Sequence, residues 1–432
     1  MKRTAALRAV ALGAAVAMIA TACASGSGGN EEAEGDGDNV TLTWWHNSNT
    51  GVGKDYYDQM ADQFETDHPG VTVEVSAMAH EDMLTKLDAA FQSGDQPDVF
   101  MERGGGELKA HVEAGLVKDI TDSAADTISA IGGSVAGWQV EGKTYALPFS
   151  LGVVGFWYNK AIFADAGITA APTTMDELYA AIDTLKAAGI EPISVGAGDK
   201  WPAAHYWYYF ALRQCSQEVL ADATQTLDFS DDCWVRAGED LEALVAKEPF
   251  NTGFLATVAQ TGPASASGLL ATGKVAMELA GHWEPGVMQG LTDDGLGLGE
   301  NTGWFAFPAV QGGDGDPTAQ LGGGDAWACS NDAPDVCVDF LEFMLSNEVQ
   351  KGFAEYDMGL PTLPSATAFV SAPELAQLLA VRNEAPYIQL YFDTAFGESV
   401  GGAMNDAIAN VFGSVGSAQD IVDATQAAAE NA

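Results

Sequence analysis

The chain is poor in basic residues. Its 432 residues include 18 lysines and arginines against 61 aspartates and glutamates, which gives a formal net charge of -43 at pH 7. Proteins that bind nucleic acids or anionic membrane surfaces do so through clustered cations. The charge balance therefore argues strongly against both kinds of partner, and it favours solubility without specifying a ligand.

Histidine is also scarce, with six in the chain. The histidines form neither an HExxH pattern nor any paired spacing, so we expect no bound zinc. The acidic run 314–316 could hold Ca²⁺ weakly, but we expect it to be a solvated loop. GESVG at 397–401 matches the nucleophile elbow of α/β-hydrolases around Ser399, yet no histidine follows His282 to complete a triad. We expect no metal and no cofactor.

The N-terminal apolar run, residues 9–20, is too short to span a membrane. It follows a basic start and precedes small residues and Cys23, which predicts an export signal over 1–22. The four residues that end at Cys23 resemble a bacterial lipobox. We therefore expect Cys23 to carry lipid at the extracellular face of the cell membrane, followed by a flexible acidic linker over 23–39.

Cysteine is rare as well, with five in the chain. If Cys23 carries lipid, four remain: Cys215, Cys233, Cys329 and Cys337. An exported protein can pair four cysteines in three ways, and the sequence leaves the connectivity open. The local pairs 215 with 233 and 329 with 337 are the simplest, and we expect structural rather than redox roles.

The stretch Val40–Val75 contains the strongest structural signal. Alternating apolar residues predict a strand, helical spacing of Tyr57, Met60 and Phe64 predicts a helix, and a second alternating run follows, which together make a βαβ unit. Ligands in open α/β sheets bind outside the carboxyl ends of strands. The loop 45–49, with Trp45, His46 and Asn47, is expected at such an end, and its aromatic and amide groups suit a neutral, hydroxyl-rich ligand.

Strands continue to alternate with helices along the chain, and the length is too great for one ordinary core. We expect an α/β fold of two lobes joined by extended segments near Pro148, Gly281 and Gly322. The expected lobes are 40–148 plus 283–321 (lobe I) and 149–282 plus 322–432 (lobe II).

Further candidate site residues lie at predicted loop ends. Glu102 and Arg103 follow a short strand, and Asp325 follows three glycines that permit close approach of a ligand to the backbone. Trp201 and Trp283 each lie beside glycine or proline and polar residues, where an indole ring can stack on a pyranose. The candidate ligand-binding residues are Trp45, His46, Asn47, Glu102, Arg103, Trp201, His205, Trp283 and Asp325. We expect Trp44, Tyr206, Trp207 and Phe210 to be core residues instead.

Several segments together resemble family 1 of the extracellular solute-binding proteins, which serve carbohydrate ABC transporters. They are the export signal with Cys23, VTLTWWHNS at 40–48, PDVF at 97–100, GKTYALP at 142–148, WYNK at 157–160, PTTMDEL at 172–178 and GKVAM at 273–277. The resemblance implies a two-lobe periplasmic-binding-protein-like fold of type II with crossover hinge segments. It also implies a mono- or oligosaccharide in the cleft, held near the candidate residues above, and delivery to permease subunits.

Two other functions remain open from the sequence. Acidic residues are abundant, and a glycosidase needs only two carboxylates that meet in space, so a secreted carbohydrate-active enzyme is the main alternative. A lipoprotein that senses sugar is another. The expected protein is a monomer without enzymatic activity.

Overall fold

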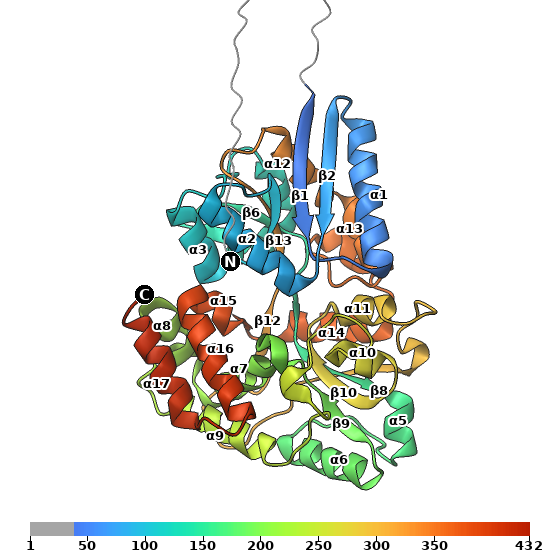
Figure 1. Ribbon diagram of the computed structural model, residues 1–432, viewed down its shortest axis with the longest axis vertical. Coiled ribbons are helices and arrows are strands. Elements are labelled where there is room, and N and C mark those ends of the chain that lie inside the picture. Colours follow the sequence, from blue (N-terminus) through green and yellow to red (C-terminus); the bar gives the residue numbers. More distant parts are fainter. Residues whose placement is uncertain (1–38) are drawn as a thin grey trace, which may run out of the picture. The chain divides into compact units, whose positions relative to one another are not determined.

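The structural unit that the computed structural model describes comprises residues 39–432. The expected export signal, the lipidated Cys23 and nearly all of the acidic linker lie outside the described residues. Two groups of strands with their own cores make up this unit, and we refer to them as lobe I and lobe II (Figure 1).

Lobe I is built on a sheet of five strands in the order β2-β1-β3-β13-β6. The strands β1, β2 and β3 run parallel, whereas β13 is antiparallel to β3 and β6. The bounds are β1 Val40–His46, β2 Val71–Ala77, β3 Val99–Glu102, β6 Ala146–Pro148 and β13 Ala326–Cys329, with a small hairpin of β4 Gln139–Val140 and β5 Lys143–Thr144. The helices are α1 Gly51–Asp67, α2 His80–Ser93, α3 Gly105–Glu113, α4 Ala125–Ile131, α12 Val336–Met344 and α13 Asn347–Glu355, with 3-10 turns at Gly132–Trp138 and Pro364–Phe369.

The period of two along these strands sends side chains into a core on each face of the sheet. Val99 and Met101 pack with Trp44 on one face, while Phe100 packs with Leu108 on the other. The βαβ unit predicted over 40–75 is confirmed, since β1 and β2 are parallel and α1 connects them. Trp44 is fully buried, as predicted.

Lobe II holds a sheet in the order β11-β8-β10-β9 and a smaller one in the order β14-β12-β7. Its strands are β7 Gly152–Val153, β8 Gly155–Asn159, β9 Glu191–Ser194, β10 Val275–Ala280, β11 Thr302–Ala306, β12 Gln320–Gly323 and β14 Ile388–Leu390. Its helices are α5 Lys160–Asp165, α6 Met175–Ala187, α7 Trp201–Gln214, α8 Gln217–Thr226, α9 Cys233–Val245, α10 Ala266–Ala271, α11 Glu284–Gly290, α14 Pro373–Glu384, α15 Phe392–Phe396, α16 Glu398–Phe412 and α17 Ala418–Ala429, with 3-10 turns at Ala197–Asp199, Phe254–Ala256 and Gly299–Asn301.

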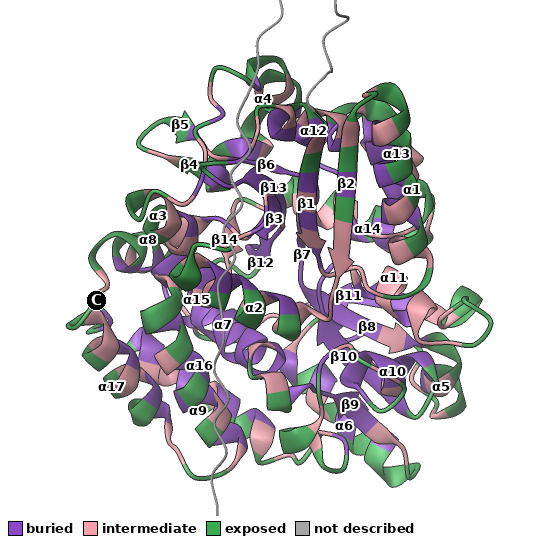
Figure 2. Cartoon of the chain, turned by 45° about the horizontal axis from the view of Figure 1, so that its top comes forward, coloured by how far each residue is buried: buried purple, intermediate pink, exposed green. Residues whose placement is uncertain are grey.

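The helix α7 is surrounded by the other helices of lobe II. Every residue from Pro202 to Gln214 is buried, as Figure 2 shows by colour, which fits a helix that is apolar on all sides. The predicted core residues Tyr206, Trp207 and Phe210 lie within it and are confirmed as core. The buried α7 fixes the position of its first residue, Trp201.

The strand pairing corrects the predicted lobe boundaries. β11, within the segment 283–321 assigned to lobe I, pairs with β8 in lobe II. β13, within the segment 322–432 assigned to lobe II, pairs with β3 in lobe I, and the orange helices α12 and α13 lie beside the blue elements of that lobe in Figure 1. These two assignments were therefore wrong. The alternation of apolar residues predicts that a strand forms, but it does not predict which sheet that strand joins.

The chain passes between the lobes near two of the three expected places. It crosses from β6 to β7 after Pro148 and from β12 to β13 after Gly322. The expected crossing near Gly281 was wrong, because β10 before it and β11 after it both pair with β8. A third crossing instead follows Phe369, between the last turn of lobe I and α14.

Both pairs of described cysteines form disulfides. Cys215 at the end of α7 bonds to Cys233 at the start of α9, and Cys329 of β13 bonds to Cys337 of α12. These are the local pairs that the sequence favoured as the simplest. Each bond ties a helix to a neighbouring element of the same lobe, which is a structural role.

Candidate ligand-binding cleft

A cavity of about 490 Å³ lies between the two lobes. Residues that line it from lobe I are Asn47, Ser48, Asn49, Thr50, Gly53, Tyr57, Ala79, His80, Glu81, Asp82, Arg103, Phe149, Asp325, Phe353 and Met358. Residues that line it from lobe II or a crossing segment are Ser150, Asp199, Trp201, His205, Val258, Ala259, Gln260, Thr261, His282, Trp283, Gly286, Val287, Tyr391, Asp393 and Thr394. Cavities of this size hold small ligands.

The ends of the parallel strands bring these residues together. In lobe I, Asn47 follows β1, His80 lies shortly after β2 and Arg103 follows β3, so all three reach the same sheet edge. In lobe II, the carboxyl ends of the parallel strands β9 and β10 lead to Trp201 and Trp283. The cavity therefore lies where the strand ends of both lobes face each other.

Three aromatic rings from lobe II form one wall of the cavity. The Trp201 and Trp283 ring centroids lie 6.1 Å apart at 70°, and those of Trp283 and Tyr391 lie 6.5 Å apart. A Cβ atom on Gly281 would come within 2.2 Å of the Trp283 ring, so the glycine lets the indole lie against the backbone. An aromatic wall of this kind offers flat apolar faces to a ligand.

Several buried polar atoms of lining residues have no hydrogen-bond partner within residues 39–432. They are His205 Nδ1, His282 Nδ1, Trp283 Nε1, Tyr391 Oη and Thr394 Oγ1. Leaving such groups unpaired destabilises a protein by about 1–3 kcal/mol each. Their number in one cavity indicates a ligand with many hydroxyl or amide groups that would pair them.

The cleft histidines are neutral near pH 7. Burial lowers the pKa of His205 to about 4 and that of His80 and His282 to about 3. His282 Nε2 lies 2.5 Å from the Ser150 hydroxyl, and His80 Nδ1 lies 3.1 Å from the Asn47 amide nitrogen. A neutral imidazole can both donate and accept, which suits binding to hydroxyl groups.

Six of the nine predicted binding residues line the cavity: Asn47, Arg103, Trp201, His205, Trp283 and Asp325. The first three lie at strand or helix ends, and Asp325 precedes β13 at the same edge of lobe I. Contact of these side chains with a ligand stays a prediction.

The structure corrects the positions of the other three, because β1 and β3 run further than the sequence predicted. His46 is the last residue of β1, fully buried between the rings of Trp44 and Tyr57. Trp45 faces the opposite side of the sheet, where Lys86 Nζ lies 3.9 Å from its ring centroid. Glu102 ends β3 and is 1% exposed.

Sequence reasoning missed many of the lining residues, and two groups of them show why. His80 and Glu81 begin α2 just after β2, so the strand-end rule that found Asn47 also applies to them. Tyr391, Asp393 and Thr394 follow the short strand β14, which has no clear alternation in the sequence. Their place depends on pairing of β14 with β12.

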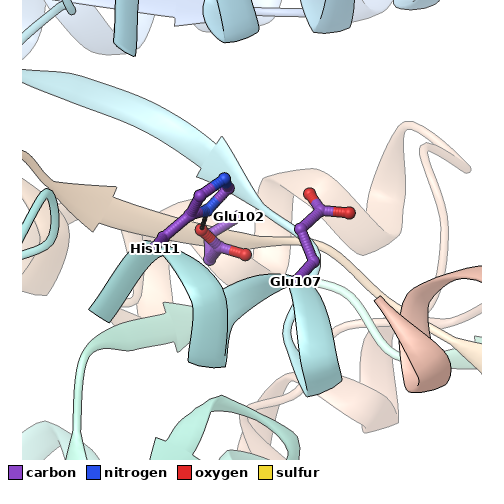
Figure 3. A group of neighbouring side chains, drawn as sticks. All are labelled: Glu102, Glu107 and His111. Carbon is purple, nitrogen blue, oxygen red and sulfur yellow. Dashed lines mark hydrogen bonds and ion pairs between the residues drawn. The ribbon is translucent and has the colours of Figure 1, made fainter. Parts of the chain in front are cut away.

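Glu102, Glu107 and His111 form the one group of three potential metal ligands found within residues 39–432 (Figure 3). Each already has a protein partner. His111 Nδ1 lies 2.8 Å from Glu102, and Arg103 donates to Glu107 through Nε at 3.2 Å and through a terminal nitrogen. We infer that this group positions Arg103 at the cleft.

The lobes also contact each other directly beside the cavity. Trp201 Nε1 donates to Glu81 at 2.8 Å, which joins α7 of lobe II to α2 of lobe I. Gly106 of α3 packs so closely on α15 that a Cβ atom there would lie 2.8 Å from the Ala395 carbonyl oxygen and from Gly397 nitrogen. These contacts hold lobe I and lobe II together on the two sides of the cavity.

Replacing Gly106 by alanine is expected to weaken ligand binding about tenfold, because the added methyl group wedges the lobes apart and overpacking costs about 1–3 kcal/mol. The test is the affinity measured by calorimetry with a ligand that the parent protein binds. The matched control is Gly402→Ala, because a Cβ atom on Gly402 would meet no other atom within 4 Å. This variant should bind the ligand with the affinity of the parent. Equal affinities for both variants and the parent would show that the α3–α15 contact is not needed for binding.

The family model of bacterial extracellular solute-binding proteins matches residues 48–351, well over half of the chain. The chain belongs to this family. Within residues 39–432, no helix has the length and apolar character needed to cross a membrane. The family resemblance found in the sequence and the two-lobe α/β fold are thereby confirmed.

Individual relatives are distant. A putative binding protein of Brucella abortus is 28% identical over 167 residues, which cover 38% of this chain and 40% of that protein. The diacetylchitobiose binding protein DasA of Streptomyces coelicolor is 24% identical over 81% of this chain and 84% of its own length.

Solved structures share the fold. A structure from work on xylan utilization by Caldanaerobius polysaccharolyticus has a TM-score of 0.82 at 24% identity and covers 90% of this chain and 99% of its own. A chitin oligosaccharide binding protein has a TM-score of 0.80 at 24% identity, with 92% and 99% covered. This likeness shows that the fold is that of solute-binding proteins.

Proposed function

We propose that the chain binds an oligosaccharide in the cleft between its lobes and delivers it to the permease of an ABC importer. The observation that carries the proposal is the cavity itself, which combines the Trp201, Trp283 and Tyr391 rings with buried polar atoms that have no partner in the described residues. Rings that stack on a pyranose and groups that bind its hydroxyls are what a sugar site needs.

The family and several relatives support this proposal. Relatives named for sugars include the diacetylchitobiose binding protein and a multiple sugar-binding protein of Streptococcus mutans. Many aromatic groups in one cavity favour an oligosaccharide over a single ring. The expected protein partners are the permease subunits. A lipid on Cys23 would hold the protein, as a monomer, at the extracellular face of the membrane that contains them.

Binding would be linked to closure of the lobes. A ligand that contacts both lobes stabilises the arrangement in which they approach, and the permease would recognise that arrangement. The mechanism needs no covalent step. Since the family and the similar structures are binding proteins, no observation favours the glycosidase alternative.

The test is a melting screen of the purified protein against a panel of mono- and oligosaccharides. A ligand at 100 times its Kd stabilises the native state by about 2.7 kcal/mol, so at least one saccharide should raise Tm by several degrees. Each saccharide that does so should be recovered chemically unchanged. Conversion of the sugar would favour the enzyme, and a panel without any shift would contradict sugar binding.

A further inference from the structure

The cleft carries a strong excess of negative charge. Its lining includes five carboxylates, which are Glu81, Asp82, Asp199, Asp325 and Asp393. The single lysine or arginine of the lining is Arg103, and Glu107 behind it already forms an ion pair with this guanidinium. Because the lining histidines are neutral near pH 7, they do not offset the carboxylates.

Three of these carboxylates accept hydrogen bonds from neutral donors. Glu81 accepts from Trp201 Nε1, Asp199 accepts from the Ala259 N–H at 2.6 Å, and Asp393 accepts from the Asn405 amide at 3.2 Å. None of the five forms an ion pair with a lysine or arginine of the described chain. The hydrogen bonds fix the directions of these three carboxylates. Arg103, which already pairs with Glu107, is the one cationic side chain of the lining near Asp325 and Asp393, so the lining keeps an excess of negative charge.

Residues on either side of Asp393 in the sequence carry polar atoms that have no partner in the described residues. Thr394 is 1% exposed, and its hydroxyl has no partner in the described residues, as is true of the Tyr391 hydroxyl on the other side of Asp393. Asp325 comes from the opposite lobe, and burial raises its pKa to about 6 although Arg103 opposes the rise. Burial raises the pKa of Tyr391, and Asp325 and Asp393 both add to the rise, so the two carboxylates border the same part of the cavity from opposite lobes.

A metal ion fits this arrangement poorly. A bound cation needs several ligand atoms around one point, and none of the cleft carboxylates belongs to the one such group found within residues 39–432. An organic cation with further hydrogen-bonding groups is able to reach carboxylates that lie apart, because an ammonium group offers three donors and the rest of the molecule offers others.

We propose that the cleft selects saccharides that carry a protonated amino group, with Asp393 of lobe II and Asp325 of lobe I as the residues that select the charge. This inference rests on the proposed sugar-binding function and adds the substrate class. A neutral saccharide lacks the charge-assisted hydrogen bond, and a uronic acid places a like charge among the carboxylates.

The test is calorimetry near pH 7 with two sets of matched sugars. One set is glucose, glucosamine and glucuronic acid, and the other is cellobiose, the β-1,4-linked glucosamine dimer and cellobiouronic acid. The amino sugar should bind about tenfold or more tightly than its neutral counterpart, the gain typical of a hydrogen bond to a charged group. The uronic acid should not bind measurably.

The variants Asp393→Asn and Asp325→Asn keep the size of the side chain and remove its charge. Each should lower the ratio of amino-sugar to neutral-sugar affinity severalfold, whereas Asp423→Asn on the exposed face of α17 should leave the ratio unchanged. The ratio is measured because a variant that only disturbs the structure would lower the affinities for both sugars by the same factor.

Three results would overturn the proposal. In the first, a neutral sugar binds as tightly as its amino counterpart or more tightly. In the second, the uronic acid binds measurably. In the third, a neutral oligosaccharide of the melting screen binds more tightly than every amino sugar. In all three cases sugar binding itself stands. Failure of every saccharide to bind would instead contradict the proposed function.

Discussion

Replacing Glu284 by glutamine is expected to stabilise the folded protein by a few kcal/mol at pH 8, relative to the parent chain. Glu284 begins α11, directly after Trp283, and is fully buried beside Glu278 of β10. Burial raises the pKa of Glu284 to about 8, and burial together with the neighbouring Glu284 raises the pKa of Glu278. Each unit of pKa difference corresponds to about 1.4 kcal/mol.

The sign follows from proton uptake. An unfolded glutamate loses its proton near pH 4.5, whereas the folded Glu284 keeps its proton up to about pH 8. Between these values the folded state binds more protons than the unfolded state, so the free energy of unfolding decreases as pH rises. Below pH 4.5 both states are protonated and the penalty vanishes. Glutamine carries no charge in either state and removes this dependence.

Urea unfolding between pH 5 and pH 8 measures the effect. The parent should lose stability steadily across the range, and Glu284→Gln should lose markedly less, while the hydrogen bond from Ser267 Oγ, now 3.0 Å from the Glu284 carboxylate, is kept by the amide oxygen. Glu239→Gln, at an exposed position of α9, is the matched control and should follow the parent. Parallel curves for parent and Glu284→Gln would mean that Glu284 keeps an ordinary pKa in the fold.

Replacing Trp283 by alanine is expected to weaken sugar binding about thirtyfold. Its ring is the middle one of the aromatic wall, between Trp201 and Tyr391. Truncating a central aromatic contact commonly raises the free energy of binding by about 2 kcal/mol or more, and about 2 kcal/mol is close to thirtyfold in affinity.

Calorimetry with a saccharide from the melting screen measures this loss. Trp283→Phe keeps a flat ring and should recover most of the affinity. Leu296→Ala, which truncates a side chain that is 63% exposed in the loop after α11, should bind as the parent does. Affinity unchanged in Trp283→Ala would remove this indole from the ligand site, whatever the effect on melting temperature.

Local patterns predicted much of lobe I and part of the site. Alternation identified β1 and β2, and the rule that ligands bind at strand ends located Asn47 and Arg103. The prediction that His46 lies in the loop was wrong, because β1 continues through His46. One additional strand residue is enough to direct an expected loop side chain into the core. Strand ends are the least certain part of a pattern, and here they decide which side chains face the cavity.

Long-range pairing explains the rest of the errors. Whether β11 and β13 join one sheet or the other depends on neighbours more than 100 residues away, and no local pattern contains that information. Tyr391 and Asp393 reach the cleft for the same reason, through the pairing of β14 with β12. Trp201 and Trp283 could be predicted because glycine, proline and polar neighbours mark them as residues at the ends of elements.

Calorimetric titration of the mature protein with the saccharide that raises its Tm most, followed by mass analysis of the recovered sugar, tests the central claim most directly. The account predicts saturable binding of one saccharide per chain, about thirtyfold weaker binding by Trp283→Ala, and recovery of the sugar unchanged. Recovery of a cleaved sugar, or equal binding by the parent and Trp283→Ala, would contradict it.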